Sequence, residues 1–150
     1  MSDNYSLVIK NGSCYIEGKF QSIDIALSGN KIKKVGKIDL NSSKVFDATG
    51  KMVLPGVIDT QVHFREPGAN DAENLESGSR AAIAGGVTSV FEMPNTNPPT
   101  STFKEFNNKL KAAKDRMYCN YAFYFGATPN NMKELALVNT LEGCCGVKLF

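Results

Sequence analysis

The chain has few metal-binding side chains, because His63 is the only histidine among its 150 residues. One imidazole cannot build a metal site alone, since metal sites in proteins combine several ligands. The cysteines lack C-x-x-C spacing, which argues against both a zinc knuckle and a disulfide framework. They are Cys14, Cys119, Cys144 and Cys145. A metal bound near His63 must therefore draw on other ligand types or on ligands outside these residues.

Long apolar runs are absent as well. No segment approaches the ~20 apolar residues that are needed to span a bilayer. No basic stretch followed by an apolar one stands at the N-terminus, so nothing here has the pattern of a secretory leader. With 42% hydrophobic and 21% charged residues, the composition is that of an ordinary soluble globular protein. We therefore expect a cytoplasmic location and no membrane partner.

The formal net charge is only +2, which gives no sign of a tail that binds nucleic acid. One group of basic residues falls on a predicted outer helix, together with acidic residues, and we interpret it as a solvated face. Its members are Lys104, Lys109, Lys111, Lys114 and Arg116. We therefore expect no nucleic-acid partner.

The first part of the chain predicts short strands separated by turns. Asn11-Gly12 lies between the strand-like segments Tyr5–Lys10 and Ser13–Glu17 and predicts a hairpin. Ser28-Gly29-Asn30 predicts the next turn, and Asn41-Ser42-Ser43 predicts a loop. Residues 1–52 are thus predicted to form a small β-rich module, which is near the lower size limit for an independent core.

After Pro55-Gly56 the pattern changes to strands that alternate with helices, which is typical of parallel βα units. The chain ends inside a strand, and a parallel strand is normally followed by a helix, so we interpret the sequence as an N-terminal fragment. We expect residues 53–150 to hold three βα units and the start of a fourth strand. The predicted strands are Val57–His63, Val87–Met93, Met117–Phe125 and Gly146–Phe150, and the predicted helices are Asn74–Ala84, Ser101 or Thr102 to Lys114, and Asn131–Val138.

Polar residues alternate at the end of the first of these strands. If the strand continues, the side chains of Asp59, Gln61, His63 and Arg65 lie on one face, because side chains at i and i+2 project the same way. That face could hold a metal ion and an anionic substrate. Gln61 is the weak point, because an amide is a much poorer transition-metal ligand than an imidazole.

Four motifs follow one another in the second part of the sequence. They are Leu54–Asp59 (LPGVID), His63–Gly68 (HFREPG), Glu92–Thr100 (EMPNTNPPT) and Gly146–Phe150 (GVKLF). In this order they resemble the cyclic amidohydrolases, and within that family the class I dihydroorotases. Arg65 and Asn95, in the second and third motifs, fit a dihydroorotase better than its allantoinase and hydantoinase relatives.

The resemblance implies an α/β fold, with the N-terminal part of a small β-sandwich followed by the first half of a TIM-like (β/α)₈ barrel that is incomplete at its C-terminus. It implies interconversion of N-carbamoyl-L-aspartate and dihydroorotate, a step of pyrimidine biosynthesis, with one or two divalent metal ions, zinc in the first place. The remaining metal-binding histidines and the catalytic aspartate are then expected beyond Phe150. The 150-residue chain alone is expected to be inactive.

The resemblance assigns roles to three residues near the ends of the first two barrel strands. His63 is implied to be a metal ligand, although a lone histidine often only packs at a surface. Arg65 and Asn95 are implied to bind the substrate carboxylate, for which a planar guanidinium is well suited. Otherwise Arg65 is a loop charge or a salt-bridge partner of Glu66, and Asn95 is a turn residue with its own Asx hydrogen bond.

Lys148 and Gln61 each have more than one possible role, so the sequence does not decide the ligands of the metal site. Lys148 has the position of a lysine that is carbamylated and bridges two metals in part of the superfamily, although other class I dihydroorotases use an aspartate there. Otherwise it is an edge lysine whose stem packs on apolar neighbours. Gln61 replaces a family histidine and is a weak metal ligand. Asp59 is expected to support the site or to brace the strand start.

Two other functions remain possible, and Gln61 is the feature that supports the first of them. The complete protein could be a non-catalytic dihydroorotase homologue that acts as a scaffold for aspartate carbamoyltransferase. It could also be another cyclic amidohydrolase, with an allantoin, hydantoin or dihydropyrimidine substrate. A homo-oligomer is compatible with all three functions.

Overall fold

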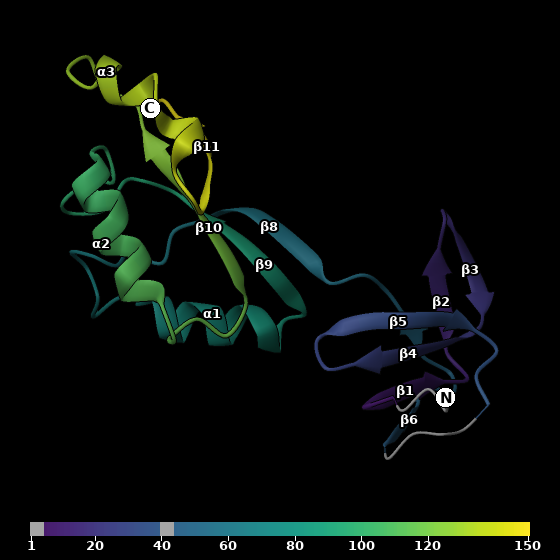
Figure 1. Cartoon of the computed structure of the whole chain (residues 1–150). Coiled ribbons are helices and arrows are strands. Elements are labelled where there is room, and N and C mark those ends of the chain that lie inside the picture. Colours follow the sequence, from purple (N-terminus) through teal and green to yellow (C-terminus); the bar gives the residue numbers. More distant parts are fainter. Residues whose placement is uncertain (1–4, 40–43) are drawn as a thin grey trace. The chain divides into compact units, whose positions relative to one another are not determined.

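The computed structural model describes residues 5–39 and 44–150, and the chain divides into two compact units, Met1–Pro55 and Gly56–Phe150 (Figure 1). The predicted loop at Asn41-Ser42-Ser43 lies outside the described residues. Within the described part of the chain, no helix has the length and apolar character to cross a membrane.

The first unit contains a four-stranded sheet with the strand order β5-β4-β1-β6. Its strands are β1 (Leu7–Lys10), β4 (Asp24–Ser28), β5 (Lys31–Gly36) and β6 (Val45–Asp47). Strands β4 and β5 are antiparallel and are joined through Gly29, whose positive φ of 58° fits the predicted turn. Tyr5, Val8, Ala26 and Ile38 are buried together and form the small core of this unit.

A three-stranded sheet with the order β3-β2-β7 completes the first unit, and it corrects the predicted hairpin. Its strands are β2 (Ser13–Ile16), β3 (Lys19–Ser22) and β7 (Met52–Val53). The hairpin partner of β2 is β3, through the turn residues Glu17 and Gly18, which both have positive φ. Asn11 has a φ of 63° as a turn residue should, but β1 and β2 lie in different sheets. The Asn-Gly signal thus predicted the local turn but not the pairing, because β1 pairs with β4 and β6 and β2 pairs with β3 and β7.

The second unit is a parallel sheet with the order β11-β10-β9-β8, and this confirms the predicted alternation of strands and helices. Figure 1 shows α1 and α2 running beside this sheet. The strands are β8 (Val57–Val62), β9 (Val87–Glu92), β10 (Asn120–Gly126) and β11 (Cys144–Lys148). The helices are α1 (Leu75–Ala84), α2 (Phe103–Ala113), the one-turn α3 (Met132–Leu135) and the 3₁₀ turn η1 (Val138–Thr140). The third predicted helix is thus divided into two short pieces.

Helix caps fix where α1 and α2 begin. The side chain of Asn74 accepts a hydrogen bond from the backbone N–H of Ser77 at 2.9 Å, and the Ser77 hydroxyl accepts one from the N–H of Asn74 at 3.1 Å. This reciprocal pair is a capping box. Thr102 caps α2 by accepting from the N–H of Glu105 at 3.2 Å. Each helix therefore starts directly after a loop that follows a strand.

Aromatic side chains hold α2 against the sheet. Phe106 is fully buried, and its ring centroid lies 6.3 Å from that of Phe123 in an edge-on contact and 6.3 Å from that of Phe125. Phe64 and Leu75 belong to the same core. Because parallel strands end at one edge of a sheet, this core fixes the loops after β8 and β9 next to each other.

Candidate active site

The end of β8 carries an irregularity that changes which side chains share a face. Asp59 pairs with Val90 and Val62 pairs with Glu92, so β8 uses one more residue than β9 over this stretch. The strand ends at Val62. Alternation through Asp59, Gln61, His63 and Arg65 was therefore a wrong prediction, because a bulge offsets the two-residue period.

Asp59 supports this irregularity. Its carboxylate accepts a hydrogen bond from the backbone N–H of Gln61 at 3.0 Å. An Asp side chain that binds the backbone two residues ahead stabilises a local turn of the chain. This contact agrees with the expectation that Asp59 braces the strand.

His63 and Asn95 are in direct contact across the ends of β8 and β9. His63 Nδ1 lies 2.8 Å from Asn95 Oδ1. Because an amide oxygen only accepts, Nδ1 carries the proton in this arrangement, and Nε2 keeps its lone pair. The backbone N–H of Met93 donates to Val62 O at 3.0 Å and joins the two strand ends just before these residues. The contact thus leaves Nε2 of His63 and the side-chain N–H₂ group of Asn95 available for other partners.

Arg65 and Asn95 line the same small hollow. Its volume is about 170 Å³, and its walls come from two loops, which we call the Arg65 loop (residues 63–70) and the Asn95 loop (residues 93–100). The lining residues are Arg65, Pro67, Gly68, Ala69, Asn95, Thr96 and Asn97. Both named side chains are exposed, so a ligand can reach them.

The backbones of the two loops touch each other. The N–H of Asn97 donates to Pro67 O at 3.0 Å. A Cβ atom on Gly68, whose φ is 111°, would lie 2.6 Å from Asn97 O. Only glycine fits both this φ and this close approach. These backbone contacts hold the two loops next to each other.

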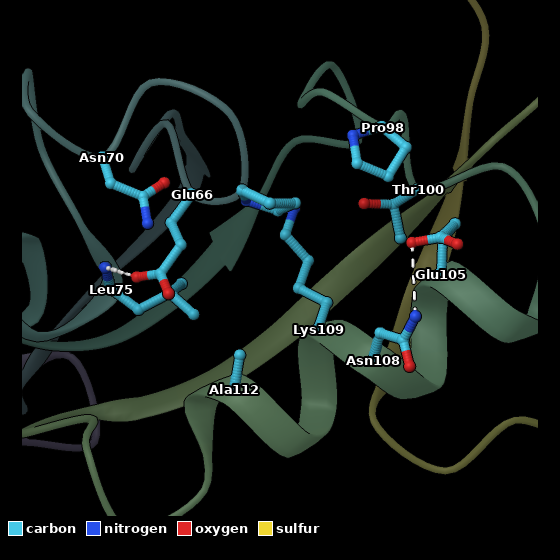
Figure 2. A pocket seen from close by; sticks show the side chains of 10 residues that line it. Glu66, Asn70, Leu75, Pro98, Thr100, Glu105, Asn108, Lys109 and Ala112 are labelled. Carbon is cyan, nitrogen blue, oxygen red and sulfur yellow. Dashed lines mark hydrogen bonds between the residues drawn. The ribbon is translucent and has the colours of Figure 1, made fainter.

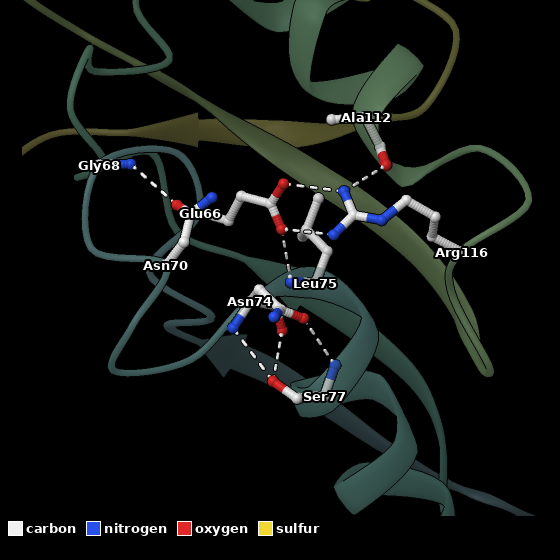
Figure 3. A network of polar contacts seen from close by, with 8 residues as sticks. All are labelled: Glu66, Gly68, Asn70, Asn74, Leu75, Ser77, Ala112 and Arg116. Carbon is white, nitrogen blue, oxygen red and sulfur yellow. Dashed lines mark hydrogen bonds and ion pairs between the residues drawn. The ribbon is translucent and has the colours of Figure 1, made fainter.

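Glu66 fixes the Arg65 loop to the helices, as Figure 3 shows. Its two carboxylate oxygens accept from Arg116 Nη1 and Nη2 at 2.8 and 3.0 Å, and one of them also accepts from the N–H of Leu75 at 2.9 Å. Burial on its own would raise the pKa of Glu66, but these hydrogen bonds and the charge of Arg116 outweigh it and hold that pKa below its ordinary value. The carboxylate of Glu66 is thus bound by Arg116 rather than by its sequence neighbour Arg65.

Lys109 contradicts the prediction that the basic residues around α2 form a solvated face. Its Nζ lies 3.0 Å from Glu92 Oε2, and each side chain is 1% exposed. Nζ also donates to Met93 O at 3.3 Å and lies 5.3 Å from the ring centroid of Phe123. Burial raises the pKa of Glu92 to about 7, although the charge of Lys109 opposes this. The lysine therefore fixes the end of β9, directly before the Asn95 loop.

A second hollow of about 270 Å³ lies against these anchoring residues, and Figure 2 shows Glu66 and Lys109 on its wall. It shares Pro67 with the smaller hollow, but Arg65 and Asn95 do not line it. Although Arg65 and Glu66 are adjacent in sequence, they line different hollows. The hollow with the residues predicted for substrate binding is the smaller one.

Gln61 and Lys148 are placed differently from the Arg65 and Asn95 pair. Neither lines the small hollow. Lys148 ends β11, is half-buried, and has its Nζ 5.3 Å from the ring centroid of Phe150. In the part of the chain that the structure describes, no three His, Cys, Asp or Glu side chains are grouped to hold a metal ion. The contact of His63 with Asn95 involves its Nδ1 and not its Nε2.

Sequence reasoning missed the two anchoring ion pairs. Only the Glu92–Lys109 pair had a weak signal in the sequence. Glu92 is a charged residue in an otherwise apolar strand, and Lys109 lies three residues after Phe106 on the apolar side of α2. Arg116 had no comparable signal, because its partner Glu66 is 50 residues away.

The sequence is similar to a known protein family. The sequence of residues 52–143 matches the amidohydrolase family. An allantoinase of Salmonella choleraesuis (strain SC-B67) is 36% identical over 148 residues, which is 98% of this chain and 32% of the relative. A dihydroorotase of Lactobacillus helveticus (strain DPC 4571) is 47% identical over 124 residues, which is 83% of this chain and 29% of the relative.

The fold has relatives among solved structures. The L-hydantoinase (dihydropyrimidinase) from Arthrobacter aurescens superimposes with a TM-score of 0.88 at 30% identity, over 95% of this chain and 32% of that chain. This chain spans about a third of the length of the relatives that it matches. Since the family match covers most of the sequence, the chain belongs to the amidohydrolase family.

Proposed function

We propose that the complete protein is a dihydroorotase, a cyclic amidohydrolase that interconverts dihydroorotate and N-carbamoyl-L-aspartate in pyrimidine biosynthesis. The observation that carries this proposal is the hollow lined by both Arg65 and Asn95. A guanidinium and an amide group can bind one carboxylate together, and dihydroorotate carries a carboxylate beside its cyclic amide. Dihydroorotases among the relatives support the same substrate.

In this proposal Arg65 and Asn95 orient the substrate. Arg65 donates two parallel hydrogen bonds to the carboxylate, and the side-chain N–H₂ of Asn95 donates a third. The Asn95 amide is already oriented for this, because its oxygen accepts from His63 Nδ1 at 2.8 Å. A side chain that is held before binding loses less conformational entropy when the substrate arrives.

His63 is the residue proposed to bind metal through Nε2, and Lys148, once carbamylated, would be a second ligand. Gln61 is at most a weak ligand. One or two divalent ions, zinc in the first place, would supply an activated water for attack on the amide carbonyl. The bond that breaks is the ring C–N bond, and its nitrogen takes up a proton. The remaining ligands and the catalytic aspartate are proposed to lie beyond Phe150.

The architecture proposed for the complete protein follows from the same assignment. Residues 53–150 would form the first half of a (β/α)₈ barrel, and residues 1–52 part of a β-sandwich. Active sites of such barrels lie at the C-terminal ends of the strands, where His63, Asn95 and Lys148 are found. The 150-residue chain alone is expected to show no turnover.

A comparison of substrates tests this proposal. The complete protein is assayed with dihydroorotate, allantoin, hydantoin and dihydrouracil. We expect the highest kcat/KM with dihydroorotate, because only this compound offers a carboxylate to Arg65 and Asn95. Arg65→Gln should lower kcat/KM for dihydroorotate by about 10² or more, the usual range for loss of a charged contact. Faster turnover of allantoin or hydantoin by the wild-type protein would contradict the proposal.

Gln61 supports a second candidate, a non-catalytic scaffold for aspartate carbamoyltransferase. An amide at this position weakens any metal site that is shared with His63. Metal content and dihydroorotate turnover of the complete protein separate the two candidates. Bound metal with turnover supports the enzyme, whereas a folded protein with neither supports the scaffold.

A further inference from the structure

We propose that Glu66 and Arg116 form a positioning clamp that holds Arg65 in its substrate-binding conformation. This inference rests on the proposed function, because it concerns how the residue that binds the carboxylate is placed. Neither residue of the clamp lines the small hollow, so neither is proposed to touch the substrate. Their effect must pass through the backbone of the Arg65 loop.

Arg65 has an unusual backbone conformation. Its φ is 60°, a left-handed backbone conformation that is unfavourable for a residue with a long side chain. Such a conformation persists only where surrounding contacts enforce it. The N–H of Ala69 donates to Arg65 O at 3.0 Å, and the N–H of Glu66 donates to Phe64 O at 2.8 Å. Both hydrogen bonds lie within the Arg65 loop, so they cannot hold this loop in place relative to the helices.

Glu66 supplies an anchor directly after Arg65. Its carboxylate binds the first residue of α1 through the N–H of Leu75, and it binds Arg116 after the end of α2. Arg116 is itself held, because its Nη1 also donates to Ala112 O at 2.9 Å. The loop is thus tied to two helices at the residue next to Arg65 (Figure 3).

The geometry of this ion pair sets it apart from an ordinary surface contact. Both oxygens of Glu66 meet both terminal nitrogens of Arg116, and the glutamate side chain is only 10% exposed. Bidentate contacts of this kind fix orientation as well as distance. By contrast, Arg80 and Glu76 on α1 form a single 3.3 Å contact, with side chains that are 64% and 44% exposed. That exposed pair provides a matched control.

The experiment compares Arg116→Gln with Arg80→Gln in the complete protein. Without Arg116 the carboxylate of Glu66 keeps only its hydrogen bond from the N–H of Leu75, so the Arg65 loop loses its contact with Arg116 and Arg65 can leave its strained conformation. We expect KM for dihydroorotate to rise roughly tenfold with less than about a threefold change in kcat, as is usual when binding is lost equally in ground and transition states. Arg80→Gln should leave both constants unchanged. Arg116→Lys, which restores the charge but not the bidentate contact, should have an intermediate KM.

A structural readout separates this inference from the proposed function. Amide hydrogen exchange of Ala69 and Leu75 reports on the Arg65 loop whether or not dihydroorotate is the substrate. We expect faster exchange at both amides in Arg116→Gln than in Arg80→Gln. If the wild-type protein does not turn over dihydroorotate, the proposed function fails while the exchange data still test the hold on the loop. Unchanged exchange, or a KM in Arg116→Gln equal to that of Arg80→Gln, would overturn the clamp.

Discussion

The Arg65 loop and the Asn95 loop are anchored by ion pairs of opposite character. The Arg65 loop depends on Glu66 and Arg116, whose side chains are 10% and 36% exposed, and the pKa of Glu66 is lowered. The Asn95 loop follows Glu92, which is buried against Lys109, and the pKa of Glu92 is raised. In the first pair hydrogen bonds outweigh desolvation, and in the second desolvation outweighs the opposite charge. One anchor therefore favours ionised Glu66, and the other favours neutral Glu92.

The largest effect is expected from Lys109→Met, because it leaves Glu92 buried without a counter-charge. Breaking a buried pair on one side typically costs about 3–5 kcal/mol. We expect the free energy of unfolding of the complete protein at pH 8 to fall by this amount, measured by urea denaturation. The loss should be smaller at pH 5, where Glu92 takes up a proton.

The double variant Glu92→Gln with Lys109→Met is the control for this prediction. It removes both charges and leaves no buried ion. We expect it to recover much of the stability that the single variant loses. A double variant as unstable as Lys109→Met would mean that the packing of the lysine stem, rather than its charge, holds α2 to the sheet.

The second effect is a pH dependence of stability that should differ between the two anchors. Because the folded pKa of Glu92 is raised from 4.5 to about 7, the folded state binds more protons than the unfolded state in this window. Its contribution to stability is therefore present below about 4.5 and is lost as pH rises to about 7, up to roughly 3 kcal/mol. Glu66 has the opposite sign, so its contribution is present above the ordinary pKa and is lost on acidification.

Urea denaturation from about pH 3 to pH 7.5 measures this dependence. Glu92→Gln should flatten the decline of stability with rising pH, because an amide does not titrate. Glu66→Gln should leave that decline in place and should instead weaken the loss of stability below pH 4.5. A decline between pH 4.5 and 7 that persists in Glu92→Gln would show that another group causes it.

Sequence reasoning reached the local features of this unit and missed the distant ones. The starts of α1 and α2 could be predicted because Asn74 and Thr102 are local cap signals. The two ion pairs could not be predicted from the sequence. Glu66 and Arg116 are 50 residues apart, and Glu92 and Lys109 lie on different elements, β9 and α2. Lys109 was assigned to a solvated face since a lysine on a helix is usually exposed, and only the packed structure shows that it is covered.

In the candidate site, too, some features could be predicted from the sequence and others could not. The motifs assign Arg65 and Asn95 to one carboxylate site, which stays a prediction, and the structure places both on one hollow. The alternation argument for Asp59, Gln61 and His63 was wrong, because the pairing of β8 with β9 contains an extra residue that no local signal announces. The metal role of His63 and Lys148 stays a prediction.

The third effect concerns Gly68, where the two loops meet. Gly68→Ala places a Cβ 2.6 Å from Asn97 O and forces alanine to adopt a φ of 111°. A backbone conformation of this kind costs about 1–3 kcal/mol, so the loops should separate. We expect a loss of roughly 2 kcal/mol in unfolding free energy and a higher KM for dihydroorotate. Gly18→Ala has a φ of 80° without a close neighbour, so it controls for the strain alone.

The smallest effect is expected from Thr102→Ala, which removes the cap of α2 while both anchors remain. The hydroxyl of Thr102 accepts from the N–H of Glu105 at 3.2 Å, and loss of such a cap typically costs about 1 kcal/mol. We expect this loss in urea denaturation with no change in KM, because Lys109 holds α2 from a position farther along the helix. Thr102→Ser keeps the hydroxyl and should retain most of the stability. An equal loss of stability in both variants would assign the effect to the threonine methyl group. A raised KM in Thr102→Ala would show that the Asn95 loop depends on the start of α2 as well as on the buried ion pair of Glu92 and Lys109.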